Sequence, residues 1–129
     1  MFEFETMRLS WRPNQYLMAP SGLCRYSKPH TLSPTFQVPV DELRDAVMAV
    51  ARRQPRTEVV AENGAAAKLL QRSKTFRFPD DIDVRFLKQG EDGSTFAIYS
   101  RARYGIRDFG VNRARVRDWL SQIHDELAA

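Results

Sequence analysis

Apolar residues recur at two different periods along this chain, and the two periods separate helices from strands. Over residues 39–53 the spacing is helical, with Leu43, Val47 and Val50 on one face. Acidic residues open this segment and arginines close it, which is the arrangement that the helix dipole favours. Pro55 follows and cannot continue a helix. The pattern predicts an amphipathic helix that begins near residue 40 and ends near residue 53.

A second helical pattern closes the chain. It runs from about residue 111 to 127, and Asn112 stands where a residue could cap its first turn. Its apolar positions form one stripe that is wide enough to pack on a sheet. They are Val116, Trp119, Leu120, Ile123 and Leu127.

Strict alternation marks two strands between the helices. Residues 81–87 place Ile82, Val84 and Phe86 on one face and charged residues on the other. Residues 94–104 place Phe96 and Ile98 on one face, with a tyrosine and two arginines opposite. The glycine- and acid-rich residues 88–93 predict that the two strands form a hairpin.

Three further segments complete the predicted architecture. Residues 57–62 and 65–71 flank Asn63-Gly64, which predicts a hairpin with a type I′ turn. Residues 35–38 predict a short strand. Residues 1–34 contain several prolines and no regular period, so we expect an irregular leader whose aromatic residues anchor it around the domain.

The predicted order is strand, helix, four strands in hairpins, helix. We therefore expect an α+β fold in which an antiparallel sheet of about five strands carries two amphipathic helices on one face. The leader spans residues 1–34, and a single domain spans residues 35–129.

Length, charge and cysteine content narrow the classes of protein. The chain has 129 residues and a net charge of +4, which permits anionic partners but does not select one. Its one cysteine, Cys24, excludes an internal disulfide and a thiolate zinc cluster. The first residues lack the apolar run of a signal peptide, and no segment has the length of a transmembrane helix. We expect a soluble, cytoplasmic chain with no cofactor and no metal, and the sequence leaves its oligomeric state open.

Basic residues concentrate near the end of the predicted hairpin. Residues 100–117 hold six arginines and one acid. Gly105 and Gly110 bracket the turn that leads into the last helix, and such a turn suits an anion or simply allows a sharp reversal. Arg113 and Arg117 share one helix face whereas Arg115 points elsewhere, so nucleic-acid binding is not favoured.

Asp81 and Asp83 are expected to lie across the hairpin from Arg101 and Arg103. These charges could form a salt-bridged ladder, worth about 0.2–1 kcal/mol per pair, that only sets the strand register. They could instead hold a carboxylate or phosphate on the two arginines, with the acids orienting them. A metal site is weaker, because no histidine is nearby.

Two blocks of the sequence resemble the DUF1499 family of bacterial and plastid proteins of unknown function. They are FPDDIDVRF at residues 78–86 and SRARYGIRDFGVNR at residues 100–113. The resemblance implies no catalytic residue or cofactor, but it implies that the polar residues of both blocks form one site. Many relatives begin with an export signal or membrane anchor, which this chain lacks. The predicted ligand-binding residues are Asp81, Asp83, Arg101, Arg103, Arg107, Asp108, Asn112 and Arg113, with Asp80 beside them.

The leading hypothesis is a non-enzymatic binding module for an anionic small molecule or lipid headgroup. One alternative is a small hydrolase or isomerase with Asp81 or Asp83 as base and Arg101 as oxyanion partner. Another is a structural or protein-interaction domain, which predicts that every charge of the ladder is paired and that no cavity adjoins it.

Overall fold

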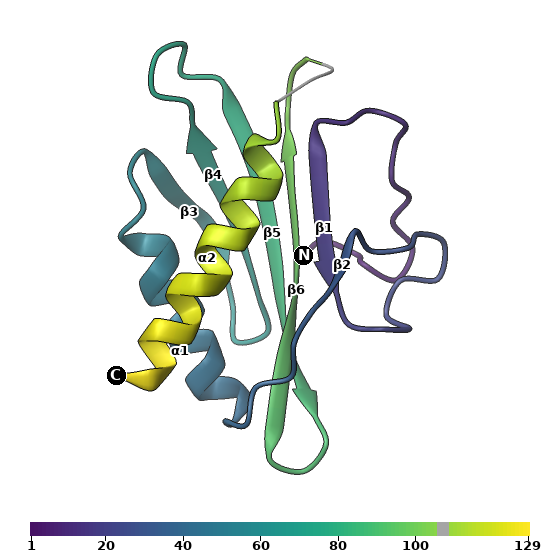
Figure 1. Cartoon of the computed structure of the whole chain (residues 1–129), viewed down its shortest axis with the longest axis vertical. Helices are drawn as coiled ribbons and strands as arrows, with labels where there is room; N and C mark the ends of the chain where they lie inside the picture. The colour runs from purple at the N-terminus through teal and green to yellow at the C-terminus, as the bar shows by residue number, and fades with distance from the viewer. Residues whose placement is uncertain (106–108) are drawn as a thin grey trace.

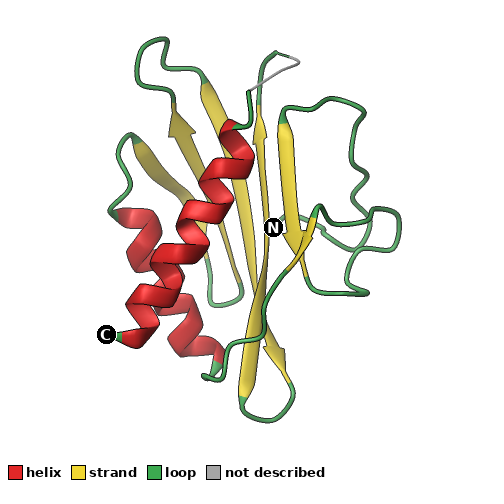
Figure 2. Cartoon of the chain, in the orientation of Figure 1, coloured by secondary structure: helices red, strands yellow, loops and turns green. Residues whose placement is uncertain are grey.

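Six strands form one sheet, and both helices pack on the same face of it (Figures 1 and 2). The computed structural model describes residues 1–105 and 109–129. The sheet order is β2-β1-β6-β5-β4-β3, and all neighbours are antiparallel except β1 and β2. The predicted α+β fold with two helices on one face is confirmed. The elements are β1 (Gln15–Ala19), β2 (Thr31–Leu32), α1 (Val40–Arg52), β3 (Thr57–Glu62), β4 (Ala66–Arg72), β5 (Pro79–Gln89), β6 (Gly93–Ala102) and α2 (Val111–Ala128).

The core lies between the two helices and the sheet. The predicted apolar stripes face inward, and Leu43 of α1 and Trp119 of α2 are fully buried. They meet the alternating residues of β5, of which Ile82 and Val84 are also buried. Burial of each such side chain contributes about 1.5–3 kcal/mol. In the described part of the chain, neither helix is long and apolar enough to cross a membrane.

The N-terminal segment is more ordered than expected. β1 lies inside it, pairs with β6 and β2, and is buried at all five positions. A strand covered on both faces shows no alternation, and Pro13 and Pro20 flank it rather than interrupt it. The irregular leader predicted for residues 1–34 is therefore wrong in this part. The predicted strand at residues 35–38 is also wrong, because only Phe36 bridges to β6.

The predicted hairpin of β3 and β4 is present, but its turn is not type I′. The turn has three residues, and none of them has a positive φ. The Asn63 side-chain oxygen accepts hydrogen bonds from the backbone N–H groups of Ala65 and Ala66, at 2.8 and 2.9 Å. The asparagine therefore closes the turn with its side chain rather than with a left-handed backbone.

The first residues of the chain cover the face of the sheet that the helices leave open. Phe4 and Met7 pack there against Leu17. Arg85 forms an ion pair with Glu5 and donates to the carbonyl oxygen of Phe2 at 2.9 Å. This contact with the guanidinium lowers the pKa of the Glu5 carboxyl. The central strands are thus covered on both sides.

Candidate functional site

The predicted Asp–Arg ladder lies on the sheet face opposite the helices. Asp81 stands directly across from Arg101, and Asp83 stands across from Tyr99. The ion pairs run diagonally, however, from Asp83 to Arg101 and from Asp81 to Arg103. Long arginine side chains reach the diagonal neighbour on an antiparallel pair. The structure therefore brings these four residues together as expected, with the partners shifted by two positions.

Asp83 is the most buried charge of this ladder, with 1% of its surface exposed. Its carboxylate accepts from Arg101 Nη1 at 2.6 Å and from Lys68 Nζ at 2.8 Å. The Arg101 guanidinium also lies 4.6 Å from the Tyr99 ring centroid and 5.1 Å from that of Phe2. Asp83 is thus held by two cations, and its chemistry is that of a structural counter-ion. Lys68 was not predicted, because its proximity depends on the β4–β5 register.

Asp81 and Arg103 form the more exposed half of the ladder. Arg103 donates through Nε at 3.0 Å and through Nη2 at 2.7 Å to the two carboxylate oxygens of Asp81. This bidentate contact lowers the pKa of Asp81, so the carboxylate is a poor proton acceptor. The cavities found in the described part of the chain are lined by other residues. The geometry has the features that the structural alternative predicts.

A second polar cluster lies on the helix side and centres on Arg115, which is only 10% exposed. Its guanidinium contacts Asp80 at 2.9 Å, Ser100 Oγ at 3.0 Å and Asn112 Oδ1 at 2.7 Å. Asn112 also donates to the carbonyl oxygen of Asn14 at 3.1 Å. Asn112 is therefore not the helix cap that we expected: it is fully buried inside α2 and ties this helix to β1 and β6.

The predicted binding residues are therefore divided between the two faces of the sheet. Asp81, Asp83, Arg101 and Arg103 lie on one face, and Asn112 and Arg113 lie on the α2 side of the other. Arg107 and Asp108 lie outside the described residues. The sequence predicted a single cluster because adjacent positions of a strand point to opposite faces, and the path from β6 into α2 could not be derived from alternation.

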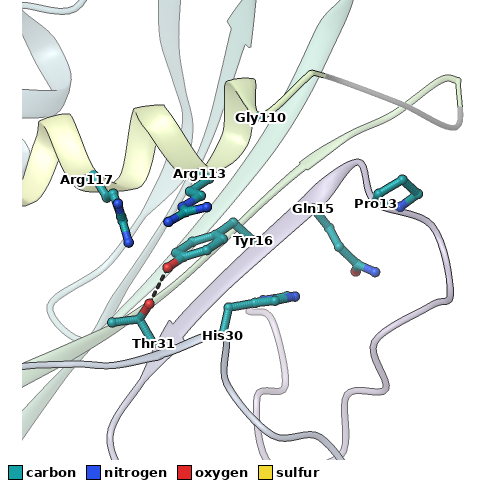
Figure 3. Close-up of a pocket in the computed structure, with 8 residues that line it drawn as sticks. All are labelled: Pro13, Gln15, Tyr16, His30, Thr31, Gly110, Arg113 and Arg117. Atoms are coloured by element: carbon teal, nitrogen blue, oxygen red, sulfur yellow. Dashed lines mark hydrogen bonds between the residues drawn. The ribbon is translucent and has the colours of Figure 1, made fainter.

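A cavity of about 490 Å³ opens between the first turns of α2 and strands β1 and β2 (Figure 3). This is the part of the helix-bearing face that neither helix covers (Figure 1). Its lining residues come from three separate segments of the chain. They are Pro13, Gln15, Tyr16, His30, Thr31, Gly110, Arg113 and Arg117.

The α2 side of this cavity is basic. Arg113 and Arg117 stand one turn apart, and both guanidinium groups project toward the strand that carries Tyr16 (Figure 3). Both side chains are exposed, and neither forms an ion pair with another described residue. Gly110 precedes α2, so the positive end of the helix dipole adjoins the cavity as well.

The strand side of the cavity is formed by Tyr16 and His30, whose rings stack at 5.1 Å. The backbone N–H of Leu17 donates to His30 Nδ1 at 2.9 Å, so the neutral ring carries its proton on Nε2. Loss of hydration against its neighbours lowers the pKa of His30. The Tyr16 and Thr31 hydroxyl groups are hydrogen-bonded to each other. His30 therefore offers an N–H donor at neutral pH.

Other reactive side chains do not form a site in the described structure. Cys24 is half-buried, and burial raises the pKa of its thiol, which makes the thiolate scarce. His124 packs against Phe36 at 5.2 Å. Among the described residues, no group of three or more His, Cys, Asp or Glu side chains could hold a metal ion.

Comparison with known proteins gives a family and two distant structural neighbours. The family model described as "Protein of unknown function (DUF1499)" matches residues 10–123. No curated protein matches the chain. The crystal structure of Ara h 8.0201 is 12% identical, with a TM-score of 0.44, and the alignment covers 75% of this chain and 95% of that one. The crystal structure of TTHA0849 from Thermus thermophilus is 14% identical, with a TM-score of 0.33 and coverage of 74% and 88%.

Proposed function

The chain belongs to the DUF1499 family, and from that starting point we propose that it is a binding module for a small anion seated between α2 and strands β1 and β2. The single observation that carries the proposal is that Arg113 and Arg117 line one cavity without forming an ion pair to another described residue. A guanidinium group binds carboxylates and phosphates through two parallel N–H donors.

The remaining lining residues indicate what kind of anion would fit. The volume of about 490 Å³ lies in the range of small-molecule pockets. Tyr16 and Pro13 supply apolar surface, while His30 Nε2–H supplies a neutral donor opposite the arginines. We therefore propose a ligand with an apolar body and one carboxylate or phosphate group.

This proposal moves the binding site away from the Asp–Arg ladder. Asp83 and Asp81 neutralise Arg101 and Arg103, so those arginines have less charge to offer a ligand. A hydrolase or isomerase would need one of the two carboxylates as a base. The lowered pKa of Asp81 and the two cations on Asp83 both oppose that role.

The test uses phenyl phosphate as the probe, followed by NMR of the His30 ring and by calorimetry. We expect Arg113→Gln and Arg117→Gln each to weaken binding about tenfold, the value of one charge-assisted hydrogen bond. We also expect the bound anion to raise the pKa of His30, because a nearby negative charge favours the imidazolium. Lys88→Gln removes one charge at the far end of the sheet and should change neither result.

Native mass spectrometry of gently purified protein gives an independent check. A bound mass that persists in Arg101→Met but disappears in Arg117→Gln supports the proposed cavity. Loss of the mass in Arg101→Met alone would return the site to the strand ladder and contradict the proposal. The proposal is also contradicted if millimolar phenyl phosphate leaves the His30 signals unchanged.

A further inference from the structure

Exposed aromatic side chains gather at one end of the sheet, which is a second feature that the cavity does not explain. Phe109 is 96% exposed, Trp11 is 77% exposed and Phe76 is 72% exposed, and Phe78 and Tyr104 are exposed as well. A single exposed aromatic residue is ordinary on a protein surface. Five of them on neighbouring loops form a patch, and such patches mark interaction surfaces.

The strand register shows that these loops adjoin one another. The β4–β5 loop begins after Arg72, which pairs with Pro79, and β6 ends beside Asp80 at Ala102. The chain enters β1 at the same end, where Ala102 N–H donates to the carbonyl oxygen of Asn14 at 2.9 Å. The three loops therefore stand side by side at the upper end of the molecule (Figure 1).

The charge of this end is also one-sided. Its described loop residues are 10–14, 73–78, 103–105 and 109–110, and they contain four basic residues and no acid. The basic residues are Arg12, Lys74, Arg77 and Arg103. Only Arg103 among them forms an ion pair with a described residue. An aromatic patch with a basic border is complementary to a surface that is apolar below and anionic above.

We propose that these three loops seat on a bilayer surface that contains anionic lipids. Trp, Tyr and Phe side chains prefer the boundary between headgroups and acyl chains, and lysine and arginine residues beside them are attracted to anionic headgroups. This proposal goes beyond the small-anion cavity, because it uses different residues and a different face of the molecule.

The arrangement of the aromatic residues favours a membrane over single-stranded nucleic acid. Stacking of successive bases needs open ring faces along a groove that follows the phosphate backbone. Phe76 and Phe78 instead stack on each other at 5.6 Å, which occupies one face of each ring. The aromatic residues are carried by separate loops rather than along one groove (Figure 1).

Vesicle flotation with the full chain tests the proposal. We expect binding to vesicles of phosphatidylcholine mixed with phosphatidylglycerol at low salt, and much weaker binding to phosphatidylcholine alone. Trp11 should then shift its emission to the blue, while the buried Trp119 stays constant. Phe76→Ser with Phe78→Ser should lower the partition coefficient about tenfold or more. Lys74→Gln with Arg77→Gln should lower it about 20-fold, at about fivefold per charge.

Matched controls separate this surface from the rest of the molecule. Val60→Ser removes an exposed apolar residue on β3, and Lys88→Gln removes an exposed charge at the opposite end; both should bind vesicles as the parent does. Arg117→Gln should also bind as the parent does, whereas a headgroup held in the cavity would require that arginine. An unchanged thermal midpoint in each variant shows that folding is intact.

Three results would overturn the proposal. The first is that the parent chain fails to float with anionic vesicles at low salt. The second is that the Phe76/Phe78 variant floats as well as the parent. The third is binding of oligothymidylate, without vesicle binding, that depends on the same aromatic residues; this would assign the surface to single-stranded nucleic acid.

Discussion

Replacement of Asp83 by asparagine tests whether the ladder is structural. The carboxylate accepts charged hydrogen bonds from Lys68 and Arg101, each worth about 1.5–3 kcal/mol. Asparagine keeps one acceptor oxygen, and the two cations regain some hydration because Lys68 is 38% and Arg101 is 21% exposed. We therefore expect Asp83→Asn to lower the free energy of unfolding by about 2–4 kcal/mol.

The assay is urea unfolding followed by fluorescence, with the slope compared between parent and variant. A chain of 129 residues has an unfolding entropy of about 0.27 kcal/mol/K, so the thermal midpoint should fall by about 7–15 °C. Asp92→Asn makes the same chemical change in an exposed loop and should cost little. The reasoning fails if Asp83→Asn costs less than about 1 kcal/mol, the range of an exposed ion pair. It also fails if Arg101→Met and Asp83→Asn are strictly additive, because contacting partners should couple.

Two further predictions concern local contacts. The pKa of Asp81 is lowered in the folded chain by Arg103, so the stability from this pair is complete above the unfolded value of about 4 and is lost as the pH falls through the lowered value. The stability difference between the parent and Asp81→Asn, measured by urea unfolding, should therefore shrink from pH 7 toward pH 2.5, and a constant difference would contradict the assignment. Asn63→Ala should lower the free energy of unfolding by about 0.5–2 kcal/mol, as for a lost helix cap. Asn63→Asp keeps the acceptor oxygen and should cost less; equal losses in the two variants would rule out the side-chain turn.

The parts of the fold that could be predicted from sequence are those with local periodicity. Helix α1 and the β5–β6 hairpin were predicted because one face of each is apolar and the other polar, which leaves a period in the sequence. β1 has no such period, since α2 covers one of its faces and the N-terminal residues cover the other. Its flanking prolines suggested irregular structure, although they only mark its ends.

The candidate site was predicted less well than the fold, because it depends on contacts between distant segments. The pairing of Asp83 with Arg101 follows from one hairpin and could be anticipated. The cavity joins His30 to Arg113 and Arg117, and nothing local to a lone histidine shows that β2 will lie beside β1. The hairpin turn failed for a different reason, since the Asn63 side chain can close a turn without the left-handed backbone that we assumed.

The pairing of β1 with β6 has a consequence for how the chain folds. Strands β3 to β6 are consecutive hairpins and can form from near neighbours in sequence. β1 must wait for a partner about 80 residues further along the chain, and closing so long a loop costs entropy before any contact repays it. Although it is synthesised early, β1 therefore docks late. Until it does, β6 is an open strand edge, and crowding of newly made chains is most hazardous during that interval.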